Sequence, residues 1–181
     1  FVVGYTSTSM CGKCSGLRFF FVQNYVNSKS SNMETGTAQK RITLAFINNK
    51  SVILDVICNE LVASGTKVLF RSENIDVGLS QLSVLKELPK VCMIDLDFYG
   101  KNVLAQLQKL RIQYPTIKLI AHSDIDAEKA VKPLLEIGFS GYLFIGSDAD
   151  DFRKAVEVVV NDGRYFSMGV AKIAQEYFTN N

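Results

Sequence analysis

Short apolar runs alternate with longer amphipathic stretches along most of the chain from residue 41 onward. Such runs are typical of strands buried on both faces of a parallel sheet, and they occupy residues 42–47, 67–70, 91–96, 117–121 and 141–145. Between them, leucine, isoleucine and valine recur at helical spacing, which predicts helices near residues 52–62, 79–85, 104–110, 127–137 and 150–160. This alternation predicts an α/β fold, a doubly wound sandwich with its site at the carboxyl ends of the strands.

The composition restricts the class of protein. The 181 residues are 48% apolar and 21% charged, which fits one globular domain, or one domain with an appendage. A net charge of +2 at pH 7 provides no broad basic surface, so we expect no direct nucleic-acid binding by this chain. The apolar runs are too short to cross a bilayer, so we expect no membrane contact. The absence of a recognisable secretory signal and of a disulfide framework favours a cytoplasmic location.

The amino-acid composition of the sequence changes near residue 40. Residues 27–39 contain almost nothing that could enter a core, which is typical of a linker. We therefore expect residues 1–40 to be a poorly ordered N-terminal extension, residues 41–165 to form the folded domain, and residues 166–181 to form a C-terminal connecting helix.

Cysteine spacing leaves one question open. Cys11 and Cys14 form a CxxC pair in the extension. A structural zinc site needs four ligands, and the single histidine, His122, is far away in sequence. A thioredoxin-like redox pair opens a helix directly after a strand, whereas this pair follows a polar run. Cys58 and Cys92 lie inside apolar segments and are expected to be buried, unreactive thiols.

Four segments carry recognisable motifs: MIDLDFYG at 93–100, YPTIKLI at 114–120, EIGFSGYL at 136–143 and NDGRYFS at 161–167. The first of them places Asp95 at the end of a strand and a glycine five residues later in the loop. Over residues 41–167 the chain resembles the receiver domain of two-component response regulators, whose usual segments are LLDLxMPG, YPxIKVI, EAGADGYL and GGRYFS. The last motif is similar to that of receivers joined to a LuxR-type helix-turn-helix.

The resemblance implies a flavodoxin-like (βα)5 sandwich with a five-stranded parallel sheet, and a signalling protein that is not an enzyme. Asp95 matches the phospho-accepting carboxylate, Ser123 the hydroxyl residue of the fourth strand, and Tyr142 the switch aromatic of the fifth. The implied partners are a sensor histidine kinase, which supplies the phosphoryl group, and a DNA-binding output domain that the receiver controls.

Two departures from the family pattern make the phosphorylation pocket degenerate. Asn48 and Asn49 stand where the family has an acidic pair, and Ile145 stands where it has a lysine. Magnesium is usually held by carboxylates, so we expect no firm cofactor and at most weak Mg²⁺ binding at Asp95. Ile145 offers no positive group for the charge that develops in phosphoryl transfer, so we expect phosphorylation to switch the domain weakly.

Three functions stay open. The first is a receiver phosphorylated on Asp95. The second is a pseudo-receiver, a protein-interaction or homodimerisation module that works without phosphorylation, and Asn48, Asn49 and Ile145 favour it. The third, an enzyme on the same fold, is disfavoured because residues 48–51 do not form a glycine-rich phosphate loop.

Three further residues have plain interpretations. In a weakly switching domain, Tyr142 and Pro133 are expected to be surface residues of a fixed interface. Pro133 lies well inside the predicted fourth helix, where it forms either a kink without functional meaning or part of a reshaped output surface. His122 precedes Ser123 at a strand end and has no partner spaced for a catalytic triad, so we expect a loop residue.

Overall fold

The expected alternation of strands and helices is present in the structure, a computed structural model that describes residues 41–47, 52–96 and 102–180. The elements are β1 (Thr43–Ile47), α1 (Val52–Ala63), β2 (Lys67–Ser72), α2 (Ile75–Val84), β3 (Val91–Asp95), α3 (Val103–Gln113), β4 (Lys118–Ser123), α4 (Glu128–Ile137), β5 (Gly141–Phe144), α5 (Ala149–Val160), β6 (Tyr165–Phe166) and α6 (Met168–Asn180). None of the described helices combines the length and the apolar composition that crossing a bilayer requires.

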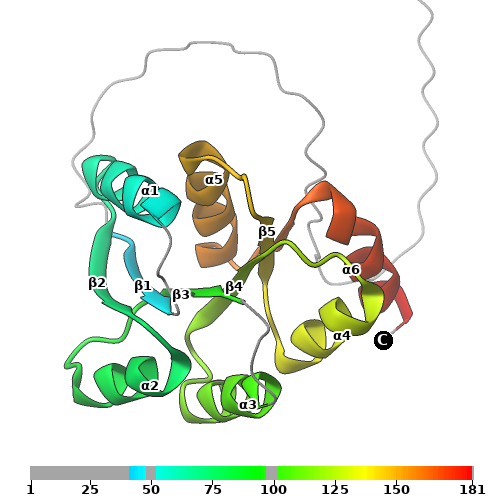
Figure 1. Ribbon diagram of the computed structural model, residues 1–181, viewed down its shortest axis with the longest axis horizontal. Helices are drawn as coiled ribbons and strands as arrows, with labels where there is room; N and C mark the ends of the chain where they lie inside the picture. Colours follow the sequence, from blue (N-terminus) through cyan, green and yellow to red (C-terminus); the bar gives the residue numbers. More distant parts are fainter. Residues whose placement is uncertain (1–40, 48–51, 97–101, 181) are drawn as a thin grey trace, which may run out of the picture.

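The described strands form one parallel sheet in the order β2-β1-β3-β4-β5-β6 (Figure 1). The fold class is confirmed, but the expected number of five strands is wrong, because β6 pairs with β5 through Gly141 opposite Tyr165 and Tyr142 opposite Phe166. A strand of two residues is too short to produce a periodic signal in the sequence. The order of the strands reverses at β1 and β3, and a crevice for ligands is expected beyond their carboxyl ends.

Helices cover both faces of the sheet. Helices α1 and α5 pack against one face, around a core that includes Phe46, Met93 and Phe152. Helices α2, α3, α4 and α6 cover the other face, around a core that includes Ile94 and Leu119 (Figure 1). Since successive side chains of a strand point to opposite faces, each buried strand contributes to both cores.

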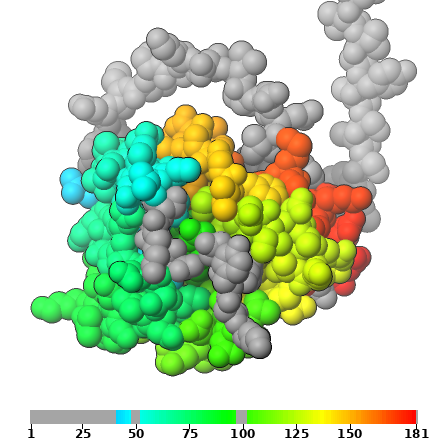
Figure 2. Space-filling view, viewed as in Figure 1, coloured from blue at the N-terminus to red at the C-terminus, as the bar shows by residue number. Residues whose placement is uncertain are grey.

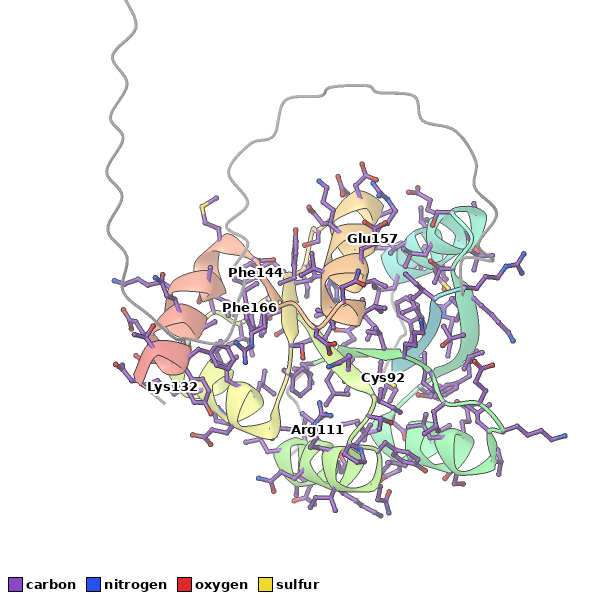
Figure 3. The ribbon with its side chains drawn as sticks, turned by 180° about the vertical axis from the view of Figure 1, so that it is seen from behind. Cys92, Arg111, Lys132, Phe144, Glu157 and Phe166 are labelled. Carbon is purple, nitrogen blue, oxygen red and sulfur yellow. The ribbon has the colours of Figure 1, made fainter. Side chains whose placement is uncertain are left out.

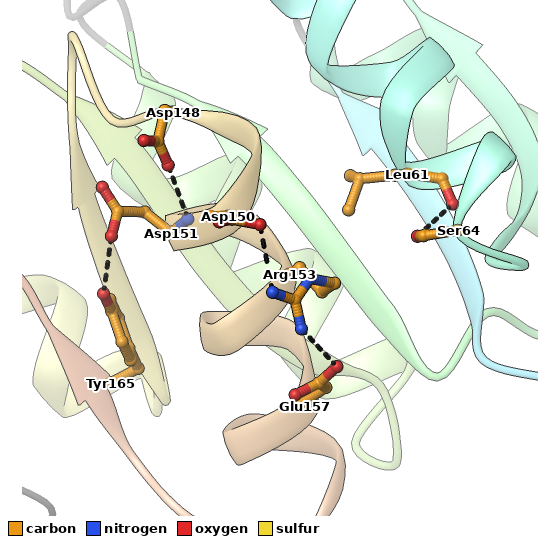
Figure 4. A network of polar contacts seen from close by, with 8 residues as sticks. All are labelled: Leu61, Ser64, Asp148, Asp150, Asp151, Arg153, Glu157 and Tyr165. Atoms are coloured by element: carbon orange, nitrogen blue, oxygen red, sulfur yellow. Dashed lines mark hydrogen bonds and ion pairs between the residues drawn. The ribbon is translucent and has the colours of Figure 1, made fainter. Parts of the chain in front are cut away.

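Several helix ends are defined by residues that satisfy free backbone groups. Asn74 caps α2 by accepting a hydrogen bond from the Val77 amide at 2.9 Å, and Asp148 caps α5 in the same way from the Asp151 amide at 2.9 Å (Figure 4). Helix α4 continues through Pro133 and ends at Gly138, whose φ of 94° is in the left-handed region that favours glycine.

The last helix, α6, packs against α4, and the two lie side by side in the space-filling view, red against yellow-green (Figure 2). Val170 and Ala174 of α6 are buried. Ahead of it, Ser167 ties the chain to β5, because its amide donates to the Tyr142 carbonyl at 2.9 Å and its hydroxyl accepts from the Phe144 amide at 3.2 Å. Residues 165–180 therefore pack against the described domain as a sixth strand and helix.

Candidate functional site

Asp95 is the last residue of β3, the strand that lies between β1 and β4 in the sheet. Its side chain is 17% exposed, so the carboxylate is partly shielded but reachable from solvent. The structure therefore places Asp95 at the reversal of strand order where the sequence predicts the site. Asn48 and Asn49, the predicted pocket residues after β1, lie outside the described residues.

His122 lies directly opposite Asp95 in the parallel register of β3 and β4. Its Nδ1 atom is 3.5 Å from Oδ1 of Asp95, and the residue is only 5% exposed. The imidazole ring packs on Phe152 of α5, with ring centroids 5.3 Å apart. The expectation of a loop residue is wrong, because β4 extends two residues beyond the predicted strand and includes His122.

Ser123 points away from Asp95, because it is the next residue along β4 and faces the opposite side of the sheet. Its hydroxyl lies 3.4 Å from the Leu96 carbonyl, to which it donates, and accepts a hydrogen bond from the Ile125 amide at 3.2 Å. The buried hydroxyl is thus hydrogen-bonded to two backbone groups, one just after β3 and one just after β4. Its predicted role as the hydroxyl that contacts a phosphoryl group stays a prediction.

Tyr142 lies in β5 and is buried, with 2% of its surface exposed, and its hydroxyl donates a hydrogen bond to the Ile125 carbonyl. Burial raises the pKa of the phenol, a hydrogen bond with Ser123 lowers it, and the carboxylates of Asp124 and Asp126 raise it further. The expectation of a surface Tyr142 is therefore wrong. Strand β5 is an interior strand between β4 and β6, and its face is covered by helices.

Pro133 and Ile145, the other two predicted positions, differ in burial. Pro133 is half-buried within α4. Ile145 follows β5 directly and is 52% exposed, and its amide donates to the Ser123 carbonyl at 3.2 Å. An apolar side chain thus lies at the position where the resemblance expects a lysine.

The described residues do not form a magnesium site. Among them, no three histidine, cysteine, aspartate or glutamate side chains come together. Asp95 supplies one carboxylate, and the His122 Nδ1 atom lies 3.5 Å from it, whereas Mg²⁺ prefers hard oxygen ligands.

A cavity of about 300 Å³ lies between α1 and α5, far from Asp95 in the fold. It is lined in part by Ile42, Gly65 and Arg153, and it opens near the amino ends of β1 and β2. The Arg153 guanidinium is already paired with Asp150 at 3.0 Å and with Glu157 at 3.3 Å (Figure 4). These two carboxylates neutralise the Arg153 guanidinium in the lining of the cavity.

Two curated proteins are similar to this chain in sequence. The chain is 34% identical over 95 residues to the transcriptional regulatory protein DegU of Brevibacillus brevis, a match that covers 52% of this chain and 40% of DegU. It is 25% identical over 142 residues to the transcriptional regulatory protein MctR of Rhizobium johnstonii, covering 74% of this chain and 62% of MctR. The chain thus spans less than two thirds of the length of these relatives. No family model matches it.

Solved structures share its fold. A LuxR-family two-component response regulator from an Aurantimonas species superposes with a TM-score of 0.65 at 15% identity, covering 77% of this chain and 99% of that one. The isolated receiver domain of RcsB from Salmonella enterica serovar Typhimurium gives a TM-score of 0.64 at 13% identity, covering 75% of this chain and 99% of that one.

The described domain has the fold of a response-regulator receiver domain, with an aspartate at the carboxyl end of β3. The chain itself is a relative of the transcriptional response regulators DegU and MctR, so the resemblance seen in its motifs is confirmed.

Proposed function

We propose that this chain receives a phosphoryl group on Asp95 from a sensor histidine kinase and thereby controls a DNA-binding output domain of a longer protein. The position of the Asp95 carboxylate supports the proposal: it ends the strand at the reversal of sheet order and is partly exposed. The relatives that carry the name transcriptional regulatory protein are longer than this chain. RcsB, which shares the fold, has been solved as dimers bound to DNA.

The proposed reaction is a transfer between a histidine and a carboxylate. A carboxylate oxygen of Asp95 forms a bond to phosphorus, the bond between phosphorus and the donor imidazole nitrogen breaks, and its electron pair stays on the imidazole. Such transfer depends on positioning and on stabilising the charge of the phosphoryl oxygens. The charge on the phosphoryl oxygens therefore has to be met by donors close to Asp95.

A second function, the pseudo-receiver that acts as an interaction or dimerisation module, is favoured by Tyr142. Its side chain is buried and its hydroxyl donates a hydrogen bond to the Ile125 carbonyl. A domain whose switch aromatic is buried can present its output surface without phosphorylation.

Intact-mass measurement after incubation with acetyl phosphate and magnesium separates the two functions. A receiver gains one phosphoryl group, and the gain is lost in Asp95→Asn. Asp124→Asn is the matched control, because Asp124 is an exposed carboxylate one residue beyond β4 and should leave the gain intact. No gain of mass in the native chain would rule out the first function and leave the pseudo-receiver.

A further inference from the structure

The sheet places a buried imidazole beside the candidate phospho-acceptor. His122 and Asp95 are paired in the register of β4 and β3, so both side chains project toward the face covered by α1 and α5. Phe152 of α5 packs on the imidazole ring and helps to hold it on that face. At 5% exposure, His122 is more than nine-tenths buried.

The Nδ1 atom of this imidazole has no hydrogen-bond partner among the described residues. It is directed at the Asp95 carboxylate, but its distance of 3.5 Å from Oδ1 is too long for a well-formed hydrogen bond. A buried polar atom without a partner lowers stability, and such atoms are uncommon in native proteins. The position of Nδ1 is explained if a further oxygen is held at Asp95 in the working state.

We propose that His122 is a positioning residue of the Asp95 site, and that its imidazole N–H donates a hydrogen bond to an oxygen of the phosphoryl group carried by Asp95. This inference rests on the proposed phosphorylation of Asp95. Ile145, an apolar residue beyond β5 that is 52% exposed, cannot donate a hydrogen bond from its side chain to the phosphoryl group. The inference assigns that donor role to His122 on β4.

The alternative donor on β4 is less suited. Ser123 projects to the opposite face, and its hydroxyl is already engaged with Leu96 and Ile125. The His122 contact, in contrast, strengthens when a phosphoryl oxygen comes within hydrogen-bond distance of Nδ1, because the 3.5 Å approach to the carboxylate is too long for a well-formed bond. An interaction that is better in the phosphorylated state than in the free one favours both transfer and retention of the group.

Two variants of the 181-residue chain test the inference. His122→Asn keeps an N–H donor close to the place of Nδ1, whereas His122→Leu fills a similar volume without a donor. We expect His122→Leu to accept a phosphoryl group from acetyl phosphate about tenfold more slowly or worse, and His122→Asn to stay within about threefold of the native rate, where tenfold corresponds to about 1.4 kcal/mol. Thermal melting of both variants checks that they are folded. Equal labelling rates of folded His122→Leu and native chain would overturn the inference.

A spectroscopic readout does not depend on turnover. Because His122 is the single histidine, one set of imidazole nitrogen signals appears in a ¹⁵N spectrum. We expect the Nδ1 signal to shift to that of a hydrogen-bonded N–H when beryllofluoride is added, and to stay unchanged in Asp95→Asn. Labelling of the native chain without this shift would overturn the role of His122 and leave Asp95 as acceptor. No labelling and no shift in the native chain would overturn both proposals.

Discussion

Side-chain alternation along β4 separates two groups that are adjacent in sequence. His122 joins Asp95 on the face of α1 and α5, whereas Ser123 and Tyr142 belong to the face of α2, α3, α4 and α6. Leu96 links the two faces, because its amide donates to the His122 carbonyl at 2.8 Å and its carbonyl accepts from the Ser123 hydroxyl. The two faces are therefore connected through the backbone of Leu96.

Restoring the acidic pair should restore metal binding. We expect the native chain to bind Mg²⁺ only weakly, and the double variant Asn48→Asp, Asn49→Asp to bind it tighter by orders of magnitude, because two carboxylates join Asp95. Calorimetric titration with magnesium measures the difference. Asn102→Asp, on a residue that precedes α3, is the control for added charge alone. Submillimolar binding by the native chain would contradict the expectation.

Tyr165 should make stability depend on alkaline pH. Burial and then the Asp151 carboxylate raise its pKa to about 12, and its hydroxyl lies 3.4 Å from Oδ1 of Asp151 (Figure 4). The unfolded phenol ionises near pH 10. The neutral phenol therefore stabilises the fold below about pH 10, and this contribution is lost as the pH rises toward 12. We expect the free energy of unfolding to fall over that interval less steeply in Tyr165→Phe, measured by denaturant unfolding at several pH values. Parallel curves would contradict this.

At the scale of elements, Arg111 joins α3 to the end of α4 (Figure 3). Its guanidinium donates to four carbonyls at 2.9–3.0 Å, those of Pro115, Ile117, Ile137 and Gly138. Desolvation lowers the pKa of Arg111. The positive group also lies at the carboxyl end of α4, where the helix dipole favours it.

Arg111→Met should therefore destabilise the domain. It leaves several carbonyls without donors, and we expect the free energy of unfolding to fall by about 2 kcal/mol or more. Arg153→Met is the matched control, because Arg153 forms surface ion pairs on α5, and such pairs contribute about 0–1 kcal/mol. Urea unfolding of both variants gives the comparison, and equal losses would show that the four contacts of Arg111 add nothing.

Strand β6 and helix α6 close the edge of the sheet beyond β5. Phe166 packs near Phe178 of α6 with ring centroids 6.3 Å apart, and the Arg164 guanidinium lies 3.7 Å from the centre of the Phe178 ring. Phe144 and Phe166 are labelled beside this helix in Figure 3. The surroundings of Tyr142 are thus completed by C-terminal residues of the same chain.

At the scale of the whole molecule, the apolar residue at position 145 limits how much phosphorylation can change. Moving a two-state domain from 1:99 to 99:1 requires about 5.5 kcal/mol of differential binding. One hydrogen bond to a charged oxygen contributes about 1.5–3 kcal/mol. A site without a lysine at residue 145 therefore supplies part of that difference. Either the resting population lies near the working state, or a partner supplies the remainder.

Beryllofluoride should accordingly produce only a small change. We expect the oligomeric state and the Tyr142 side-chain signals to be nearly the same with and without it, by analytical ultracentrifugation and nuclear magnetic resonance. Asp95→Asn with beryllofluoride gives the baseline for unspecific effects. A full shift from monomer to dimer on adding beryllofluoride to the native chain would restore an ordinary switch.

The fold should not need the first part of the chain. Residues 41–180 include a sheet with helices on both faces and two buried cores. We expect deletion of residues 1–38 to leave the melting temperature within a few degrees, since the removed residues precede β1. Calorimetry of the shortened and full chains measures this. Insoluble or unfolded protein after the deletion would show that these residues belong to the core.

The sequence by itself determined the order of strands and helices and the place of Asp95. The signals for these elements are local in the sequence: apolar runs of strand length, helical spacing between them, and glycines after α1 and α4. Each signal depends only on residues within its own segment. In a sheet of parallel strands joined by helices, ligands bind beyond the carboxyl ends of the strands, and Asp95 is predicted to lie there at the end of β3. Burial of the Cys58 and Cys92 thiols followed from the same pattern and is confirmed.

Only the tertiary structure decided which side chains meet. His122 is 27 residues from Asp95, and their contact depends on the register between β3 and β4, which no local pattern records. Strand β6 has two residues and is defined only by its backbone pairing with the edge of β5. Tyr142 is buried because β6 and the helices around it cover β5. These contacts arise between segments far apart in the chain, and their energies are set by packing and pairing in the folded molecule.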